Sequence, residues 1–224
     1  MIHNAFQKIT WDASADARAL RGKASLSLDI RARLNKALEY AVKPVLDSIR
    51  NGNGEGRLLD VGTGTGALIP EIVTQGIPAH CIVGIDISAG MVRVASKLYP
   101  KATFITGDFL EFNPENGPLF DSILFCMAIH DLPNPLASVS HALKLLRSGG
   151  GRIIISHPRG ANHVVMQHRA NPVMVPHLLP SKEELEKLIF SESGDSAIKF
   201  IIPPNTPNDE RDKTEGYLCV IEKL

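Results

Sequence analysis

The chain has 224 residues, of which 44% are hydrophobic and 21% are charged, so it is long enough for one α/β domain with a substantial core. Its 24 lysine and arginine residues balance 24 aspartate and glutamate residues, which gives no overall attraction for nucleic acid or an anionic membrane. No apolar run is long enough to span a bilayer and Met1–Lys8 lacks the pattern of a secretory signal, so we expect a cytoplasmic protein without nucleic-acid or membrane partners.

Residues 1–54 are predicted to form a helical extension that acts as a lid on the domain that follows. An apolar stripe at helical spacing runs from Ile30 to Ile49 and is interrupted at Pro44. Asn51–Gly54 has the composition of a linker, so the domain itself is predicted to span residues 55–224. Trp11 fits two roles in the extension, either lining a substrate pocket or only holding the extension against the domain.

Seven short apolar runs predict seven β-strands, and the first five alternate with helical patterns. Runs of this kind are typical of a parallel sheet that is covered by helices on both faces. The sequence therefore predicts an α/β fold with a doubly wound, Rossmann-like sheet. These five strands are predicted at Arg57–Gly62, Cys81–Asp86, Ala102–Asp108, Phe120–Met127 and Arg152–His157, and the helices at Ala67–Thr74, Ala89–Leu98 and Leu136–Leu146.

The end of the chain breaks this alternation, since only a polar loop separates the strand-like runs Ala197–Ile202 and Tyr217–Glu222. Without a crossover helix the two runs must pair or neighbour each other as an antiparallel hairpin, which gives seven strands that are mostly parallel. Three cysteines lie far apart, each inside an apolar run. They are therefore predicted to be buried free thiols, and no metal site is expected at Cys81, Cys126 and Cys219.

The most informative motif is a glycine turn after the first predicted strand. Asp60 ends an apolar run, and Gly62, Gly64 and Gly66 follow at spacings of two, directly before a helical pattern. Glycine permits positive φ and lets a ligand approach the backbone, while the start of a helix offers unpaired N–H groups. Such a turn suits a polar, adenosine-sized cofactor. By itself it fits both the dinucleotide fingerprint and the first motif of S-adenosylmethionine-dependent methyltransferases.

Four further motifs follow in the right order and at the right spacing, and together the five resemble a class I S-adenosylmethionine-dependent methyltransferase of the small single-domain kind. The resemblance covers residues 55–157 closely and the last hairpin in outline. Ser148 stands where the family often has proline, which is a mild departure at a structural position. The five motifs are Leu59–Gly66, Val83–Ser88, Thr106–Leu110, Phe120–Asp131 and Ala142–Gly151.

The resemblance implies S-adenosylmethionine as cofactor and a role for each motif. The glycines of the turn would face the methionine half of the cofactor, and Asp60 would lie near its ammonium group. Asp86 would accept hydrogen bonds from both ribose hydroxyls, and Asp108 would accept one from the adenine amino group. The cofactor-binding residues implied in this way are Asp60, Gly62, Thr63, Gly64, Gly66, Asp86, Ile87, Met91, Asp108, Phe109, Cys126 and Met127.

Simpler interpretations of these side chains stay open. Asp86 and Asp108 are also compatible with capping a turn or helix, although Ser88 is the better cap for the helix that follows Asp86. Met91 and Met127 belong to a residue type that often fills gaps in a core. Met127, however, follows the carboxyl end of a strand, where ligands bind in this type of sheet.

His130 and Asp131 follow the fourth predicted strand and are the candidate catalytic residues. Histidine exchanges protons near neutral pH, so His130 is the candidate general base if the methyl acceptor is a hydroxyl or a carbon acid. Asp131 would orient it. The alternatives are an exposed loop histidine and an aspartate that caps the next helix.

The segment from His157 to Pro180 contains six basic or titratable side chains and no acid. It starts beside the fourth-strand loop, and loops of this length are usually functional or disordered. We therefore expect His157, Arg159 and Arg169, together with Trp11, to contact the substrate. A solvated connection is the alternative, and the histidine spacing does not match a familiar zinc site.

These observations predict an enzyme that moves a methyl group from S-adenosylmethionine to a small polar or anionic molecule. Two rivals stay open, an NAD(P)-dependent oxidoreductase and an S-adenosylmethionine-binding protein without catalysis. Short-chain oxidoreductases have a lysine four residues after a catalytic tyrosine, and Tyr40, Tyr99 and Tyr217 lack one. The chain also lacks the Asn/Asp-Pro-Pro-Tyr run of amide- and base-nitrogen methyltransferases. This absence and the neutral overall charge both argue against a nucleic-acid substrate.

Overall fold

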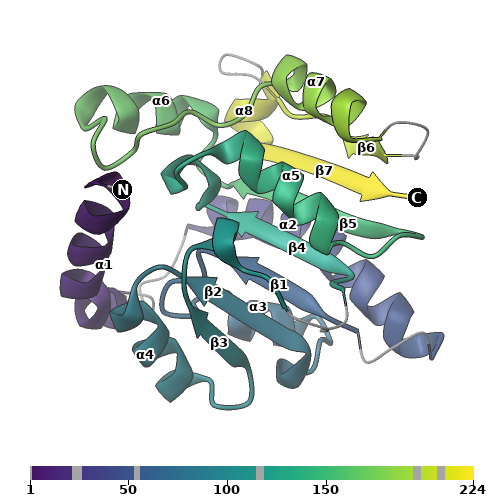
Figure 1. Cartoon of the computed structure of the whole chain (residues 1–224), viewed down its shortest axis with the longest axis horizontal. Coiled ribbons are helices and arrows are strands. Elements are labelled where there is room, and N and C mark those ends of the chain that lie inside the picture. The colour runs from purple at the N-terminus through teal and green to yellow at the C-terminus, as the bar shows by residue number, and fades with distance from the viewer. Residues whose placement is uncertain (1, 22–26, 53–55, 115–118, 194–197, 206–209) are drawn as a thin grey trace.

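The computed structural model describes residues 2–21, 27–52, 56–114, 119–193, 198–205 and 210–224. The strands are β1 (Leu58–Val61), β2 (Ile82–Asp86), β3 (Thr103–Thr106), β4 (Ser122–Cys126), β5 (Gly151–His157), β6 (Ile198–Ile202) and β7 (Tyr217–Lys223). They form one sheet in the order β3-β2-β1-β4-β5-β7-β6, in which β7 runs antiparallel to both of its neighbours (Figure 1). The predicted fold class and the antiparallel C-terminal hairpin are confirmed. Ala197, the predicted start of the sixth strand, lies outside the described residues.

Eight α-helices and three short 3-10 segments are described. Ser88 Oγ accepts a hydrogen bond from the backbone N–H of Met91 at the start of α4, as predicted, and Asn134 caps α5 in the same way. The α-helices are α1 (Ile2–Arg21), α2 (Leu28–Arg50), α3 (Ile69–Thr74), α4 (Ala89–Leu98), α5 (Pro135–Leu145), α6 (Ala161–Ala170), α7 (Lys182–Ser193) and α8 (Glu210–Glu215), and the 3-10 segments are η1 (Ala79–Cys81), η2 (Phe109–Glu111) and η3 (Ile129–Asp131).

Alternating side chains divide the core between the two faces of the sheet. Leu59 and Val61 of β1 pack in one cluster with α5 and α7, whereas Leu58 packs in the other with α2 and α3. Helix α2 continues through Pro44, where its apolar stripe suggested an interruption. Burial of neighbouring residues such as Val45 against the sheet outweighs the hydrogen bond that proline removes. The division of the chain at residue 54 stays a prediction.

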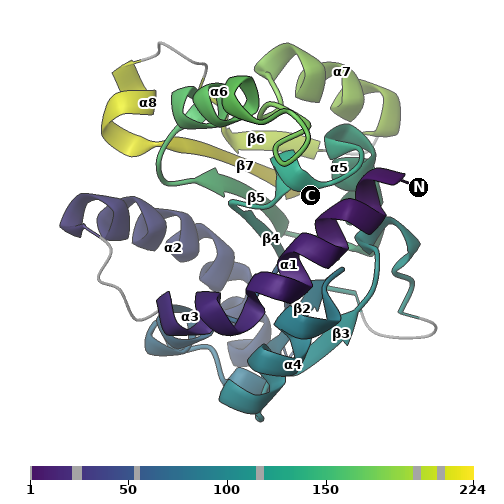
Figure 2. The ribbon, with the colours of Figure 1, turned by 90° about the vertical axis from the view of Figure 1, so that its left-hand side faces the viewer.

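Figure 2 looks onto the edge of the sheet at which the parallel strands end. Helix α1 crosses this edge and packs against α4 (Figures 1 and 2). The loops that leave β1, β2 and β4 therefore meet underneath α1. In open α/β sheets this edge is where ligands bind.

Helix α6 is held by a residue far away in the chain. Asp212 of α8 accepts hydrogen bonds from the backbone N–H groups of Ala161 and Asn162, which lie in the first turn of α6. Gly160, just before this turn, has φ of 87°, and a Cβ there would lie 2.7 Å from Asp212 Oδ2. Helix α6 thus takes its cap from α8, and its own sequence carries no capping signal.

The three cysteines are buried and free, as predicted. Within the described residues, no helix is both long and apolar enough to cross a bilayer. In the same part of the chain, no three histidine, cysteine or acidic side chains are grouped as metal ligands would be.

Candidate active site

The glycine turn after β1 adopts a backbone conformation that glycine reaches without strain. Gly62, Gly64 and Gly66 have φ of 71°, 56° and 76°. A Cβ at Gly62 would lie 2.6 Å from the Cβ of Ala128, and one at Gly66 would lie 2.8 Å from the ring of Tyr99. A Cβ at Gly64 would meet nothing within 4 Å. Gly62 and Gly66 are thus needed for close packing, whereas Gly64 borders an open space.

Asp86, at the end of β2, holds this turn in place. Its Oδ2 accepts a hydrogen bond of 2.8 Å from the backbone N–H of Gly64, and its Oδ1 accepts one of 2.9 Å from that of Ser88. These two donors orient the carboxylate at the carboxyl edge of the sheet. Asp86 therefore orders the turn and at the same time faces the space in front of it.

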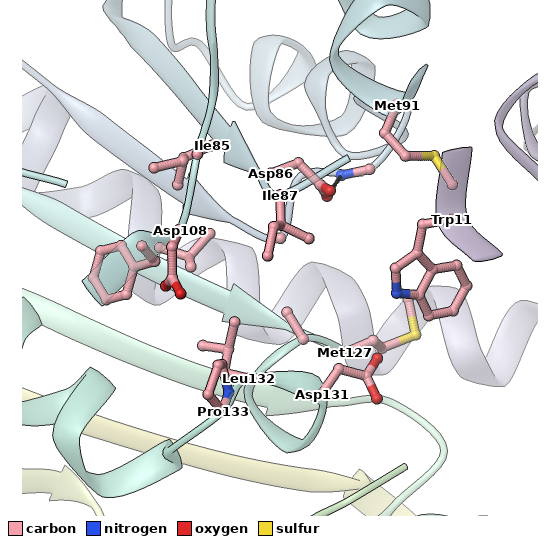
Figure 3. Close-up of a pocket in the computed structure, with 16 residues that line it drawn as sticks. Trp11, Ile85, Asp86, Ile87, Met91, Asp108, Met127, Asp131, Leu132 and Pro133 are labelled. Atoms are coloured by element: carbon pink, nitrogen blue, oxygen red, sulfur yellow. Dashed lines mark hydrogen bonds between the residues drawn. The ribbon is translucent and has the colours of Figure 1, made fainter. Parts of the chain in front are cut away.

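A pocket opens at this edge, next to the turn (Figure 3). In the close-up, Trp11 and Met91 stand on one side of the pocket, and Asp131 and Leu132 stand across from Ile87. The wall is mostly apolar, with three carboxylates spaced along it. Its lining residues are Trp11, Val61, Gly62, Gly64, Ile85, Asp86, Ile87, Met91, Gly107, Asp108, Phe109, Met127, Ala128, Asp131, Leu132 and Pro133.

Asp60, just before the turn, is a buried acid with an unused acceptor. Its side chain is almost fully buried, and burial raises its pKa to about 7. The Thr63 side chain is close enough to oppose this rise in the pKa, but neither Asp60 Oδ2 nor the Thr63 hydroxyl has a well-formed hydrogen bond within the described residues. A buried acceptor of this kind is matched by a ligand that brings a donor or a positive charge.

Three histidines form a contiguous group next to Asp131. The ring centroids of His130 and His157 are 5.2 Å apart, and those of His157 and His163 are 5.7 Å apart. His130 and His157 are only 4% and 3% exposed, and burial lowers their pKa to about 4 and about 3. Both imidazoles are therefore neutral at pH 7. His130 Nε2 lies 3.6 Å from Oδ1 of Asp131, which lines the pocket.

Met127 carries backbone strain at the pocket. Among the described non-glycine residues it alone has a positive φ, of 54°. Its N–H donates to the carbonyl of Ser156 at 2.8 Å, which holds this strained backbone against β5. The side chain is 43% exposed and lines the pocket. Such strain is usually kept where a side chain has to point into a functional site.

Residues 58–150 match the family model described as a methyltransferase domain. This central segment is therefore a methyltransferase domain. Ubiquinone/menaquinone biosynthesis C-methyltransferase UbiE of Geobacter sulfurreducens is 33% identical over 138 residues, which cover 56% of this chain and 54% of that protein. Juvenile hormone acid O-methyltransferase of Drosophila melanogaster is 28% identical over 133 residues, which cover 54% and 45%. The chain spans about half the length of the curated relatives that it matches.

Solved structures show the same fold over the whole chain. Magnesium protoporphyrin IX methyltransferase from Synechocystis PCC 6803, solved with bound SAH (S-adenosylhomocysteine), aligns with a TM-score of 0.61 at 16% identity and covers 99% of this chain and 98% of that one. The plantazolicin methyltransferase BpumL in complex with SAH gives 0.64 at 18%, covering 99% and 95%. For this methyltransferase domain, the family, enzyme class and cofactor type predicted from the sequence are confirmed, and the oxidoreductase interpretation is set aside.

The structure places ten of the predicted site residues on the pocket wall. Asp60 and Thr63 are buried just behind it, while Gly66 and Cys126 lie in the packed interior. His130 and His157 lie behind Asp131. Arg159 and Arg169 are exposed and outside the wall, so their position does not support direct contact with a substrate. The ten on the wall are Trp11, Gly62, Gly64, Asp86, Ile87, Met91, Asp108, Phe109, Met127 and Asp131.

Six residues of the wall were not predicted. Val61, Ile85, Gly107 and Ala128 lie inside the five motifs, next to predicted residues, so the motifs already mark their neighbourhood. The remaining two follow η3, just beyond the end of the fourth motif at Asp131: Leu132 and Pro133.

Proposed function

We propose that this chain transfers a methyl group from S-adenosylmethionine to a small polar molecule whose accepting oxygen or carbon first loses a proton to His130. The observation that carries the proposal is the buried, neutral imidazole of His130, which lies directly behind Asp131, a residue that lines the pocket. A neutral imidazole keeps a lone pair that can accept a proton from the methyl acceptor, whereas a protonated imidazole has none. By their names, the relatives include methyltransferases that act on carbon and on oxygen.

The residues around the pocket fit S-adenosylmethionine. Gly64 leaves space where any side chain would stand, and Asp60 offers a buried acceptor to the ammonium group of the methionine half. Asp86 would hold the ribose hydroxyls, and Asp108 and Phe109 would hold the adenine. When bound, the cofactor supplies a methyl group on a positively charged sulfur, which is already activated for in-line displacement.

The chain itself aligns the acceptor, excludes water and moves one proton. Trp11, Met127 and Leu132 supply apolar wall on the acceptor side. We assign proton transfer to His130 Nδ1, which has no hydrogen-bond partner within the described part of the chain. The other ring nitrogen faces the Asp131 carboxylate at 3.6 Å, which favours the tautomer that leaves a lone pair on Nδ1. Asp131 is thus the orienting group.

A second candidate acceptor is an anion, such as a carboxylate, that needs no base. The segment 157–180 carries six basic or titratable groups and no acid, and one relative is named an acid O-methyltransferase. Arg159 lies close enough to His157 and His163 to lower the pKa of both imidazoles, so its charge reaches the histidine group. In this version Arg159 and Arg169 attract the anion from the rim of the site.

An acceptor screen separates the two candidates. The full chain is incubated with methyl-labelled S-adenosylmethionine and three acceptor classes: phenols with enolisable carbonyl compounds, carboxylates, and thiols. With the first class, His130→Asn should lower kcat by about 10²- to 10⁴-fold, while SAH binding stays unchanged. His80→Asn is the matched control, because His80 is an exposed histidine of η1 at the opposite end of β2.

Full turnover of phenols or carbon acids by His130→Asn would overturn its role as base. Turnover of carboxylates alone, with a raised KM in Arg159→Ala/Arg169→Ala, would establish the second candidate. Tight SAH binding without turnover of any class would instead establish a binding protein without catalysis.

A further inference from the structure

We propose that Asp12 is a positioning residue that fastens α1 across the cofactor pocket, so that docking of α1 and binding of the cofactor reinforce one another. The inference concerns the cofactor side of the site and holds for any methyl acceptor.

Asp12 joins α1 to the first turn of α4 through a single oxygen. Asp12 Oδ1 accepts hydrogen bonds of 2.6 Å from the Ser88 hydroxyl and 2.8 Å from the backbone N–H of Gly90. Ser88 Oγ in turn accepts one of 3.1 Å from the N–H of Met91. The first N–H groups of a helix have no partner inside the helix. Asp12 therefore completes the cap of α4 from outside.

The contact at Gly90 is so close that a side chain there would push Asp12 away. A Cβ on Gly90 would lie 3.1 Å from the Cα, the carbonyl oxygen and Oδ1 of Asp12. Hydrogen bonds from Ser88 and Gly90 also lower the pKa of Asp12, so its carboxylate is charged at neutral pH. We call this contact of Asp12 with Ser88 and Gly90 the Asp12 joint.

This joint places Trp11 at the pocket. Trp11 precedes Asp12 and lines the pocket together with Met91 (Figure 3). It packs against a small apolar cluster of Ala15, Met91 and Val94, which α1 and α4 share. If α1 left α4, the pocket would lose one side of its wall.

Hydrogen bonds also connect the Asp12 joint to Asp86, the residue proposed to bind the ribose. Ser88 donates its hydroxyl hydrogen to Asp12 and its backbone N–H to Asp86, and Asp86 accepts from the N–H of Gly64. One hydrogen-bonded series thus runs from α1 to the glycine turn. A cofactor that contacts Trp11 and Asp86 stabilises the docked position of α1. Because coupling between sites is reciprocal, docking of α1 in turn raises the affinity for the cofactor.

Asp16, one turn further along α1, is a natural comparison. Its ion pair with Arg93 of α4 spans 3.2 Å, but both side chains are mostly exposed, and such pairs contribute little. Because most of the stability of a helix in a protein comes from tertiary packing, the position of α1 depends on its packing against α4 and on the Asp12 joint.

Trp11 is the single tryptophan of the chain, so indole fluorescence reports on this joint alone. Wild type, Asp12→Ala, Asp12→Asn and Gly90→Ala are titrated with SAH, and quenching of the indole by acrylamide is measured with and without it. Asp16→Ala is the matched control on the same helix. Thermal unfolding and circular dichroism establish that each variant is folded.

In wild type and Asp16→Ala, SAH should protect the indole from acrylamide. In Asp12→Ala and Gly90→Ala, the free protein should be quenched more strongly, and the Kd for SAH should rise about tenfold, within the usual range for two coupled sites. Asp12→Asn keeps an acceptor oxygen and should recover most of both signals. Wild-type quenching in a folded Asp12→Ala or Gly90→Ala variant would overturn the proposal. So would a weakened Kd with an unchanged indole signal, because Asp12 would then act only on α4.

Discussion

The imidazole of His157 meets that of His130 edge to face, with their centroids 5.2 Å apart. Neither Nδ1 atom has a hydrogen-bond partner within the described residues. His163, which lies in α6, packs against the other side of His157. The interior beside the proposed active site therefore holds two titratable groups that are kept neutral by burial.

This pair should make the protein sensitive to mild acid. In the unfolded chain both imidazoles bind a proton near their usual pKa of 6.5, but in the folded chain only near about 4 and about 3. The unfolding free energy is thus undiminished above pH 6.5 and is lost as the pH falls towards 4, by at most about 1.4 kcal/mol per pH unit and imidazole. Urea unfolding at several pH values measures this slope. His157→Gln should reduce it, whereas His80→Gln, at an exposed site, should not.

Asp60→Asn should separate stability from cofactor binding. The folded pKa of Asp60 is raised to about 7, so the stability linked to its protonated form is present below 3.8 and is lost as the pH rises through 7. The variant should therefore be more stable than wild type at about pH 8. Its SAH affinity should be lower and nearly independent of pH, whereas wild-type affinity should rise from about pH 6 to 8 as Asp60 ionises. Asp47→Asn, at a surface aspartate of α2, controls for loss of charge. Equal SAH affinity at all pH values would place the ammonium group elsewhere.

Gly64→Ala should weaken cofactor binding, while its loss of stability should be no larger than that of another alanine at a positive φ. The positive φ of 56° strains any L-residue by roughly 1–2 kcal/mol, and the new Cβ would enter the pocket. Gly52→Ala is a matched control, because Gly52 has φ of 67° and an open environment but lies in a surface turn. Both variants should lose similar thermal stability, and Gly64→Ala alone should lose affinity for SAH in calorimetry. If Gly52→Ala lost as much affinity for SAH as Gly64→Ala, backbone strain and not the new Cβ in the pocket would explain the weaker binding.

Asp86→Ala should weaken both the turn and the cofactor site. It removes acceptors for the N–H groups of Gly64 and Ser88, each worth about 1–3 kcal/mol if left unpaired. The ribose hydroxyls would lose their proposed partner as well. We expect a lower melting temperature and, in addition, a smaller upward shift of that temperature on adding SAH. A full shift in the variant would show that the ribose is held by another residue.

The sheet and its glycine turn could be predicted because their signals are local. Five apolar runs, the glycine spacing and the cap at Ser88 each depend on neighbours within a few positions. The sequence placed the segment that follows β5 beside the loop of His130, but it could not show that His157 and His163 pack against each other and that His130 and His157 are buried. The backbone strain at Met127 and the Asp12 joint could not be predicted from the sequence for the same reason. Each is a contact between segments that lie far apart in the chain.

The segment 157–180 shows what a sequence pattern leaves undetermined. Its cluster of basic residues suggested arginine anchors, but Arg159 and Arg169 point to exposed positions, while His157 turns inward. A charge count along a segment does not resolve which side chains face the interior. That depends on how α6 sits on the sheet.

The cap that Asp212 provides for α6 has a consequence for how such enzymes can be recombined. A chimera that imports the segment 157–180 from another protein must bring a glycine at position 160, because a side chain there collides with the Asp212 carboxylate. A chimera that exchanges the C-terminal part must retain the acid, or the N–H groups of Ala161 and Asn162 lose their acceptor. A single crossover between the two stretches is therefore compatible with this cap only where the second parent also has glycine at position 160 and an acid at position 212.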